Sequence, residues 1–429
     1  MGQFRKLAWE PEYADGPIRW RRQGPYFAYI PCKLNNLRLN ITPDLSQRVA
    51  RLEQRLGSLG DVETNSDLAG VARFLLRSEA IASSQIEGIA PAARKIAIAE
   101  LVQNKMSTAK ADESADLVAR NMTTVLDATT KMASSDRITL EDIESLNQSL
   151  LADPTARVRD KQNWVGRSNT SPLDAEFVPP HPDDLPELLA DFVDYLNGAT
   201  HSAIIQAALI HAQFETLHPF EDGNGRVGRA LIQTVLVRRR LLPNSLIPIS
   251  QVLSTWRDRY VSALMDFRAE GEADSAPVME GASSWISFFV ECVEQAVIQA
   301  ETLADELAKL RVQWADQIDQ WNVSQGAQRA LRSDSAVARI LAKLPATPVL
   351  TAKSAAQIHD ISPVAVRRAL MQLADAKVLI ASGEGTNTDH FRSPELLDLI
   401  TFSERALAST QFDTCVSKPN RPVPARPQQ

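Results

Sequence analysis

The stretch HPFEDGNGRVGR, residues 218–229, gathers residue types that are suited to chemistry on a phosphate group. It begins with His218, whose near-neutral pKa suits a base that takes a proton from an attacking hydroxyl. Asp222 supplies a hard oxygen ligand, which suits a magnesium ion already held by phosphate oxygens. Phe220 is apolar between polar neighbours, and we expect it to anchor the loop in the core. These types in this order favour a site that acts on a phosphate-containing substrate.

The second half of the same stretch is suited to binding anions. Gly223 and Gly225 let backbone N–H groups approach an anion closely. A helix that starts near Asn224 and Gly225 directs its positive end towards phosphate. Arg226 and Arg229 are three residues apart, so they share one helix face and can clamp successive phosphates.

The stretch resembles the signature of the Fic family, H-x-F-x-[DE]-G-N-G-R-x-x-R, and matches it at every fixed position. A chance glycine-rich turn explains shorter patterns better than one of this length. The resemblance implies a mainly α fold, a Fic-type helical bundle, in which His218 is the general base and Asp222 holds Mg²⁺. It also implies an ATP site formed by Gly223, Asn224, Gly225, Arg226, Gly228 and Arg229.

A second motif, SSQIEG, lies upstream at residues 83–88. Ser83 and Glu87 are four residues apart and therefore lie on one helix face. Gly88 stands where a helix could end with a left-handed residue. The segment resembles the Fic inhibitory pattern [ST]-x-x-x-E-[GN]. By that resemblance, Glu87 pairs with Arg229, keeps it from the γ-phosphate and leaves ATP in an unproductive pose. Taken alone, Glu87 would be interpreted as a solvated helix carboxylate.

The proline-rich stretch at 162–182 has little helical period and indicates an extended loop or hairpin. In Fic proteins the corresponding segment is the flap, a β-hairpin over the active site on which a target protein docks by strand addition. The resemblance places four residues near the nucleotide, namely Val165, Gly166, Arg167 and Ser168. A plain connector is the alternative interpretation.

A weaker resemblance lies in RDRYVSAL, residues 257–264. Related proteins often carry two tyrosines there, close to the adenine. This chain has Tyr260 followed by Val261, so the resemblance implies an adenine contact for Tyr260 and lacks the second aromatic ring.

Residues 333–403 predict a separate winged-helix domain. Ser354–Asp360 reads as its second helix, and Ser362 and Pro363 suit the cap and first position of a recognition helix. A wing hairpin is expected after Val378. DNA binding is one use of such a domain, but basic and acidic side chains balance across 334–400, which favours protein docking or dimerisation.

The chain has 429 residues, too many for one compact domain. We expect an N-terminal region with the inhibitory helix, whose first 45 residues form an irregular packed arm, then a catalytic domain and the winged-helix-like domain. The expected boundaries are 1–110, 111–325 and 333–403, followed by a disordered tail at 410–429.

The composition of the chain limits which binding partners and which cellular compartment we expect. The net charge of -7 argues against general binding to nucleic acid or a membrane surface. Cys32, Cys292 and Cys415 are far apart, form no metal-ligand spacing and fit a reducing cytoplasm. No apolar run approaches the length of a membrane span.

Together these features predict a protein adenylyltransferase that moves AMP from ATP to a Ser, Thr or Tyr hydroxyl of target proteins and of itself, with Mg²⁺ as cofactor and inhibition by Glu87. Removal of AMP by a water that Glu87 orients uses the same residues and stays open. A DNA-binding regulator that only senses nucleotide is an alternative of another class, against which the intact His218 and Asp222 argue. Other donors, the target protein and a homodimer also stay open.

Overall fold

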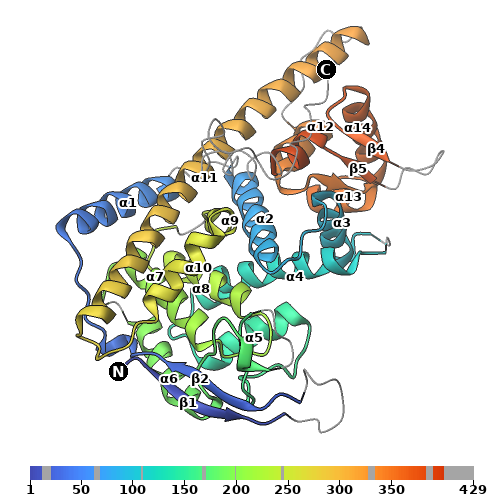
Figure 1. Cartoon of the computed structure of the whole chain (residues 1–429). Helices are drawn as coiled ribbons and strands as arrows, with labels where there is room; N and C mark the ends of the chain where they lie inside the picture. Colours follow the sequence, from blue (N-terminus) through green and yellow to red (C-terminus); the bar gives the residue numbers. More distant parts are fainter. Residues whose placement is uncertain are drawn as a thin grey trace, which may run out of the picture.

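Helices dominate the part of the chain that the computed structural model describes, which comprises residues 1–11, 21–61, 68–107, 110–166, 171–198, 200–242, 246–326, 334–382 and 390–400. In Figure 1 the long helix α11 (Ala276–Ser324) crosses the whole body, between an N-terminal hairpin at one end and a C-terminal unit at the other. The mainly α fold predicted from the sequence is confirmed. None of the described helices is both long and apolar enough to cross a membrane.

Two consecutive helices form the centre of the body. Every residue of α7 (Ala203–Leu217) is buried, and so is α8 (Asn224–Arg238) as far as Leu236. A helix that is surrounded on all sides is apolar over most of its surface, as α7 is. The helices that contact this pair include α4 (Glu113–Asp127), α5 (Leu140–Leu151), α6 (Leu185–Asn197) and α11, and α9 (Ile249–Thr255) and α10 (Arg257–Phe267) pack against α11.

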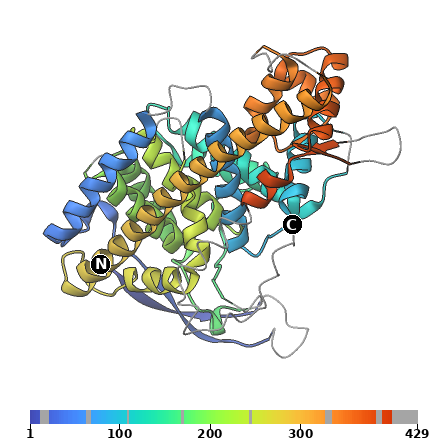
Figure 2. The same ribbon diagram turned by 90° about the horizontal axis from the view of Figure 1, so that it is seen from above.

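Local capping signals set several helix starts. Thr139 and Asp142 form a reciprocal capping box at the start of α5. Thr42 accepts a hydrogen bond of 3.3 Å from the backbone N–H of Leu45 in α1 (Pro43–Asp61). This helix continues through Gly57, which costs about 1 kcal/mol relative to alanine but does not break a helix. Figure 2 shows α1 running alongside α11.

The expectation of an irregular arm over residues 1–45 is wrong. β1 (Gln3–Trp9) and β2 (Gly24–Ile30) pair antiparallel, with Gln3 opposite Ile30. In β2, Tyr26 and Ala28 are buried, whereas Phe27 between them is 55% exposed. The aromatic residue on the outer face hid the alternation of apolar and polar residues that usually reveals a half-buried strand.

Helix α2 (Leu68–Ile86), which carries the inhibitory motif, is fixed against the bundle by a buried carboxylate. Glu79 accepts hydrogen bonds from the Ser250 hydroxyl at 2.6 Å and from the Ser250 backbone N–H at 2.9 Å. Burial raises the pKa of Glu79 to about 7, because removal from water disfavours the charged form. The start of α9 therefore helps to hold α2 in place.

The described part of the C-terminal unit contains several helices and a small sheet: α12 (Ala336–Lys343), β3 (Val349–Leu350), α13 (Ala352–His359), α14 (Pro363–Asp375), β4 (Ile380–Ser382), β5 (His390–Arg392) and a helical stretch at 394–400. The strands are antiparallel in the order β3-β5-β4. Ser362 caps α14 as predicted, and Arg367 and Arg368 are exposed. The assignment as a winged helix stays a prediction, because 383–389, at the expected wing, and the tail from residue 401 lie outside the described residues.

The C-terminal unit packs against α2 and α3 (Ala93–Gln103), as Figure 1 shows. Arg77 of α2 is fully buried there and forms an ion pair of 2.8 Å with Glu100 of α3. Its guanidinium also donates to the backbone carbonyl of Ala346, at 3.0 Å. One side chain therefore joins α2, α3 and the C-terminal unit.

Replacing Arg77 by methionine is expected to lower the free energy of unfolding by about 3 kcal/mol, because Glu100 then loses its charge partner in a buried setting. Lys95→Met is the matched control, since Lys95 and Asp112 form an exposed pair in the same region, and such pairs contribute less than about 1 kcal/mol. Urea unfolding followed by circular dichroism measures both. Equal midpoints for the two variants would contradict a structural role for Arg77.

Candidate functional site

The predicted base stands at the end of α7 in an uncommon backbone conformation. His218 has φ 46° and ψ 57°, the left-handed region that costs a non-glycine residue about 1–3 kcal/mol. Its carbonyl accepts hydrogen bonds from Arg159 Nε at 2.9 Å and Asn163 Nδ2 at 3.2 Å. Such strain persists only where surrounding contacts hold it, and these two side chains provide them.

The loop between α7 and α8 is closed by Asn224. Its Oδ1 accepts from the backbone N–H of Phe220 at 2.9 Å, and its Nδ2 donates to the Phe220 carbonyl at 2.8 Å. This amide therefore shapes the loop, and the phosphate contact that the resemblance implies for it stays a prediction. Phe220 is 1% exposed, so the predicted anchoring of the loop in the core is confirmed.

Glycine is required at two positions of this corner. Gly223 has φ 85°, and a Cβ there would lie 2.6 Å from Asn147 Nδ2. A Cβ on Gly225 would overlap the carboxylate of Glu87 and lie 2.7 Å from Arg229 Nη1. The backbone at the start of α8 therefore carries no Cβ atom at Gly225, on the side that contacts Glu87.

The two arginines of α8 have different surroundings. Arg226 is almost fully buried, and its Nη2 lies 3.5 Å from both carboxylate oxygens of Asp222, whose side chain is 73% exposed. Its Nε and Nη1 are buried and have no hydrogen-bond partner among the described residues. Buried donors without partners are rare, so an anion that accepts from Arg226 fits this position.

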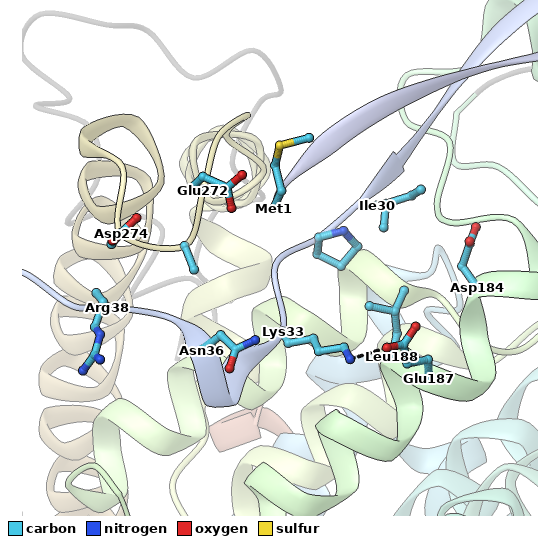
Figure 3. A pocket seen from close by; sticks show the side chains of 12 residues that line it. Met1, Ile30, Lys33, Asn36, Arg38, Asp184, Glu187, Leu188, Glu272 and Asp274 are labelled. Atoms are coloured by element: carbon cyan, nitrogen blue, oxygen red, sulfur yellow. Dashed lines mark hydrogen bonds and ion pairs between the residues drawn. The ribbon is translucent and has the colours of Figure 1, made fainter.

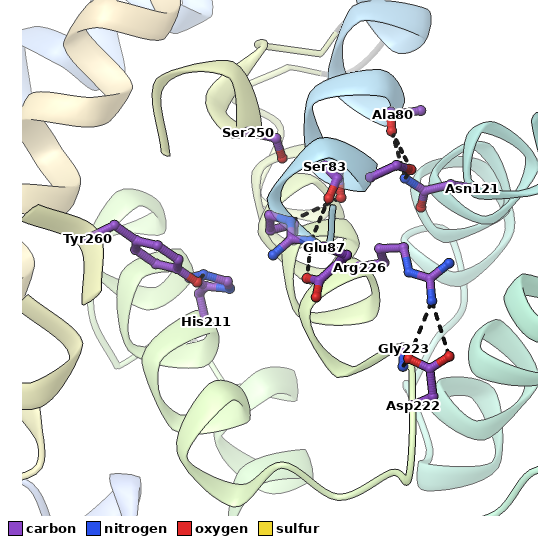
Figure 4. A network of polar contacts seen from close by, with 12 residues as sticks. Ala80, Ser83, Glu87, Asn121, His211, Asp222, Gly223, Arg226, Ser250 and Tyr260 are labelled. Carbon is purple, nitrogen blue, oxygen red and sulfur yellow. Dashed lines mark hydrogen bonds and ion pairs between the residues drawn. The ribbon is translucent and has the colours of Figure 1, made fainter. Parts of the chain in front are cut away.

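Arg229 is engaged by the inhibitory motif. Its Nε donates to the Ser83 hydroxyl at 2.9 Å, and its Nη2 donates to the Ser83 carbonyl and to Glu87 Oε1, both at 2.8 Å. Figure 4 shows Ser83 and Glu87 beside α8, with Arg226 turned towards Asp222. Gly88 has φ 80°, as expected for a left-handed residue after the helix. The structure therefore brings together the two motifs that the sequence separates.

Electrostatics within the site favour an ionised Glu87 and a neutral His218. Burial opposes the charge on Glu87, but the Arg229 guanidinium outweighs burial and lowers the pKa of this carboxyl. Burial, with the positive charges of Arg159 and Arg268, lowers the pKa of His218 to about 4. The imidazole is consequently unprotonated at neutral pH, the form that a general base needs.

Tyr260 is buried against His211, and its implied contact with adenine stays a prediction. It is 5% exposed, its hydroxyl lies 2.9 Å from His211 Nε2, and the two rings stack with centroids 5.8 Å apart. Figure 4 shows this pair apart from Asp222 and Arg226. The missing second aromatic noted in the sequence is consistent with a packing role for Tyr260.

The predicted flap is joined to the N-terminal hairpin. Within the described residues, its own pairing is one antiparallel bridge between Val165 and Phe177. Tyr29 of β2 donates its backbone N–H to the Val178 carbonyl at 2.9 Å. Gly166 has φ 138°, and a Cβ there would lie 2.8 Å from the backbone nitrogen of Glu176. The other two expected nucleotide contacts, Arg167 and Ser168, lie outside the described residues.

Two basic residues close to His218 were not identified from the sequence. Arg159 is 4% exposed and is bonded to backbone carbonyls around the loop. Arg268 lies with its guanidinium carbon 3.5 Å from the centroid of the Phe177 ring, and its Nε donates to the Thr216 hydroxyl at 3.3 Å. Neither belongs to a motif, so sequence spacing carried no signal for them.

A pocket of about 540 Å³ lies elsewhere, between the N-terminal segment, α6 and the start of α11. Figure 3 shows its lining of mixed charge, in which Lys33 pairs with Glu187 and Glu272 and Asp274 lie across from them. None of the predicted site residues lines it. The candidate site is therefore the corner between α2, α7 and α8.

This corner, a bare helix start with buried guanidinium donors, has the features that favour an anion at a helix N-terminus. The Fic/DOC family model matches residues 137–236, which include His218, Asp222 and both arginines. The chain therefore carries a Fic domain. The inhibitory motif at 83–88 lies outside the matched range.

Curated relatives match part of the chain. A protein adenylyltransferase of Caenorhabditis elegans is 33% identical over 140 residues, 31% of this chain and 26% of the relative. A probable protein adenylyltransferase of Aquifex aeolicus is 39% identical over 93 residues, 21% of this chain and 27% of the relative. The chain thus spans about a quarter of the length of these two relatives.

Solved structures with a similar arrangement include a Fic family protein from Desulfovibrio desulfuricans, with a TM-score of 0.47 and 19% identity, covering 82% of this chain and 97% of that one. The Fic-1 protein of Caenorhabditis elegans has a TM-score of 0.45 and 20% identity, covering 60% and 72%.

Proposed function

We propose that this protein transfers AMP from ATP to a Ser, Thr or Tyr hydroxyl of target proteins and of itself. The main support is the corner at α8, where Arg226 offers buried donors next to Asp222 and a neutral His218 stands at the loop entrance. In this reaction the hydroxyl oxygen bonds to the α-phosphorus, the bond to the β-phosphate oxygen breaks, pyrophosphate leaves and His218 Nε2 or Nδ1 takes the proton. The names of the curated relatives agree with this activity.

Autoinhibition by Glu87 is part of the proposal. The ion pair at 2.8 Å occupies Arg229, which is the second arginine available to the phosphates. A guanidinium that is bound by a carboxylate and by Ser83 cannot also bind the γ-phosphate. Catalysis of this kind depends on positioning and charge neutralisation, so loss of one phosphate contact leaves ATP poorly aligned.

Mg²⁺ fits this site through a single protein ligand. Among the described residues no group of three or more His, Cys, Asp or Glu side chains could hold a metal ion. The Asp222 carboxylate is 73% exposed beside Arg226, and one carboxylate with phosphate oxygens and water is a usual Mg²⁺ environment. When bound there, the ion neutralises charge on the phosphates, while the chain itself contributes the carboxylate and the arginines.

Asp222→Ala is expected to lower transfer by about 100-fold and to remove its dependence on magnesium concentration. Glu221→Ala is the matched control, because Glu221 is the neighbouring exposed carboxylate at a variable position of the motif. Incorporation of labelled AMP across a magnesium titration measures both variants. An unchanged titration in Asp222→Ala would rule out the proposed metal role.

The remaining features of the proposal concern partners. A target segment would add to the flap at 162–182, where Val165 is 37% exposed. The C-terminal unit would serve protein docking or dimerisation, with DNA binding as the less favoured use. We also propose a cytoplasmic location, supported by the buried free thiols of Cys32 and Cys292.

Removal of AMP from a modified protein is a second candidate, favoured by the 38% exposure of the Glu87 side chain, which leaves room for a water next to its carboxylate. Intact-protein mass spectrometry separates the candidates. The protein is incubated with ATP, UTP, GTP or CDP-choline, and in parallel an AMP-modified target is offered. A mass gain with ATP supports transfer, whereas a loss of AMP from the target supports the reverse reaction.

A further inference from the structure

The side chain of Arg159 lies between the flap and the catalytic loop and contacts the backbone of both. It is 4% exposed and precedes the flap by three residues. Its Nη1 donates to the Lys161 carbonyl at 3.0 Å, and its Nη2 donates to the Pro180 carbonyl at 2.6 Å. Lys161 directly precedes the outgoing leg of the flap and Pro180 lies in the returning leg, so one guanidinium joins the two ends of the flap.

The same guanidinium holds the loop that carries the predicted base. Arg159 Nε donates to the His218 carbonyl at 2.9 Å, and Nη2 lies 3.4 Å from the Leu217 carbonyl. The backbone N–H of Arg159 also donates to the Pro219 carbonyl at 2.9 Å. Three consecutive residues around His218 are thereby fixed, at the point where the backbone takes its left-handed turn.

Arg159 makes these contacts as a cation. Among the described residues it has no carboxylate partner within ion-pair distance, and backbone carbonyls replace the water around it. Burial lowers the pKa of its guanidinium to about 10, so it stays charged at neutral pH. A buried cation with only carbonyl partners costs stability, and a planar fork of five donors is the side chain that can bridge several carbonyls at once.

We propose that Arg159 is a positioning residue of the transfer reaction, which ties both flap legs to the backbone of His218 so that a target docked on the flap meets the base at a fixed spacing. This inference rests on the proposed transfer activity. The positive charge of Arg159 also affects the pKa of His218. The other groups that face His218 are Arg268 from the end of α10, Glu87 from the end of α2 and the Glu215 carbonyl of α7. Arg159 and Arg268 lower the pKa of His218, whereas Glu87 and that carbonyl raise it.

Three variants distinguish the effect of the Arg159 hydrogen bonds, called the tie below, from the effect of its positive charge. Arg159→Lys keeps the charge but cannot span four carbonyls. Arg159→Met removes both the tie and the charge. Asn163→Ser removes the other donor to the His218 carbonyl without changing any charge. Arg157→Met is the matched control, since Arg157 is an exposed arginine two residues upstream that donates hydrogen bonds to carbonyls of its own turn, those of Pro154 and Ala156.

All variants are made in full-length Glu87→Gly protein, so that the charge of Glu87 is absent throughout. Hydrogen exchange followed by mass spectrometry reports on peptides from 160–182 and 214–222, and self-modification is measured from about pH 3 to pH 9, so that the range includes the pKa of His218. We expect faster exchange in both segments for the two Arg159 variants, with transfer lowered about 10-fold by Arg159→Lys and about 100-fold by Arg159→Met. ATP binding should remain, because the arginines of α8 are untouched.

The pH profile distinguishes positioning from charge. A base works unprotonated, so transfer falls at low pH as His218 gains a proton. Loss of the Arg159 charge raises the pKa of His218, and the acid limb should move up by about one pH unit in Arg159→Met. It should stay in place in Arg159→Lys and Asn163→Ser. A simple loss of stability would not move this limb.

The outcomes of this experiment distinguish a failure of the inference about Arg159 from a failure of the proposed transfer activity. If Arg159→Met has the exchange rates and pH profile of the Arg157→Met control, the inference is overturned. If Arg159→Met does not fold, Arg159→Lys and Asn163→Ser decide through exchange and rate. If the Glu87→Gly parent takes up no label from any nucleotide donor while exchange still rises in both segments, the tie stands and the transfer activity fails.

Discussion

Transfer of AMP is expected to fall by about 10²–10⁴-fold when His218 is replaced by alanine, while ATP binding persists. The imidazole is partly buried and unprotonated at neutral pH, with its pKa lowered to about 4. The groups that we propose to bind phosphate lie on α8 and do not depend on this side chain. Bound phosphates would add negative charge and raise the pKa of His218, which brings the base closer to the working pH. Labelled-AMP incorporation and ATP affinity are measured on the same preparation.

Two further variants make this result specific to the imidazole. His218→Asn should be as inactive as His218→Ala, although asparagine tolerates the left-handed backbone at φ 46° better than other residues. His201→Ala should stay close to wild type, because His201 is bonded to Tyr195, away from the loop. Transfer retained in either His218 variant would remove the base assignment, even with ATP bound normally.

Features that depend on a few neighbouring residues could be predicted from the sequence. The start of α8 near Asn224, the left-handed Gly88 and the cap of α14 at Ser362 all follow from local chemistry and are confirmed. The pairing of Glu87 with Arg229 joins residues 142 positions apart, and only the family resemblance made it predictable. The geometry then agrees with that expectation, with Ser83 as an additional partner of the arginine.

Features that depend on side chains bonded to distant backbone could not be predicted. Arg159 reaches a carbonyl 59 residues away, and neither its type nor its spacing distinguishes it from the exposed Arg157. Asn224 bonds to the loop itself, although the motif suggested a phosphate ligand. Tyr260 is enclosed by His211 and Trp285, a packing that depends on how α7, α10 and α11 meet. Such contacts follow from tertiary structure and leave no periodic pattern.

Self-modification is expected to rise roughly 10–100-fold when Glu87 is replaced by glycine. Arg229 then loses its carboxylate partner and can bind phosphate, with which a guanidinium forms strong bidentate contacts. Glu87→Asp should raise transfer less, because the shorter carboxylate still lies near the guanidinium. Ser83→Ala should have a small effect in the same direction. It removes the hydroxyl that accepts the hydrogen bond of 2.9 Å from Arg229 Nε, but it leaves the ion pair with Glu87. AMP incorporation at equal protein concentration measures all of these variants.

The double variant Glu87→Gly with Arg229→Ala decides why the rate rises. If the gain comes from the released guanidinium, it disappears when that group is absent. If it comes from a loosened end of α2, it persists, and Gln85→Gly in the last turn of the same helix should reproduce it. Glu87→Gly that leaves transfer unchanged or lowers it would contradict autoinhibition. An AMP-modified target offered to wild type and Glu87→Gly then distinguishes two explanations. If only wild type removes AMP, Glu87 orients the attacking water. If both proteins remove AMP at the same rate, Glu87 has no role in the reaction.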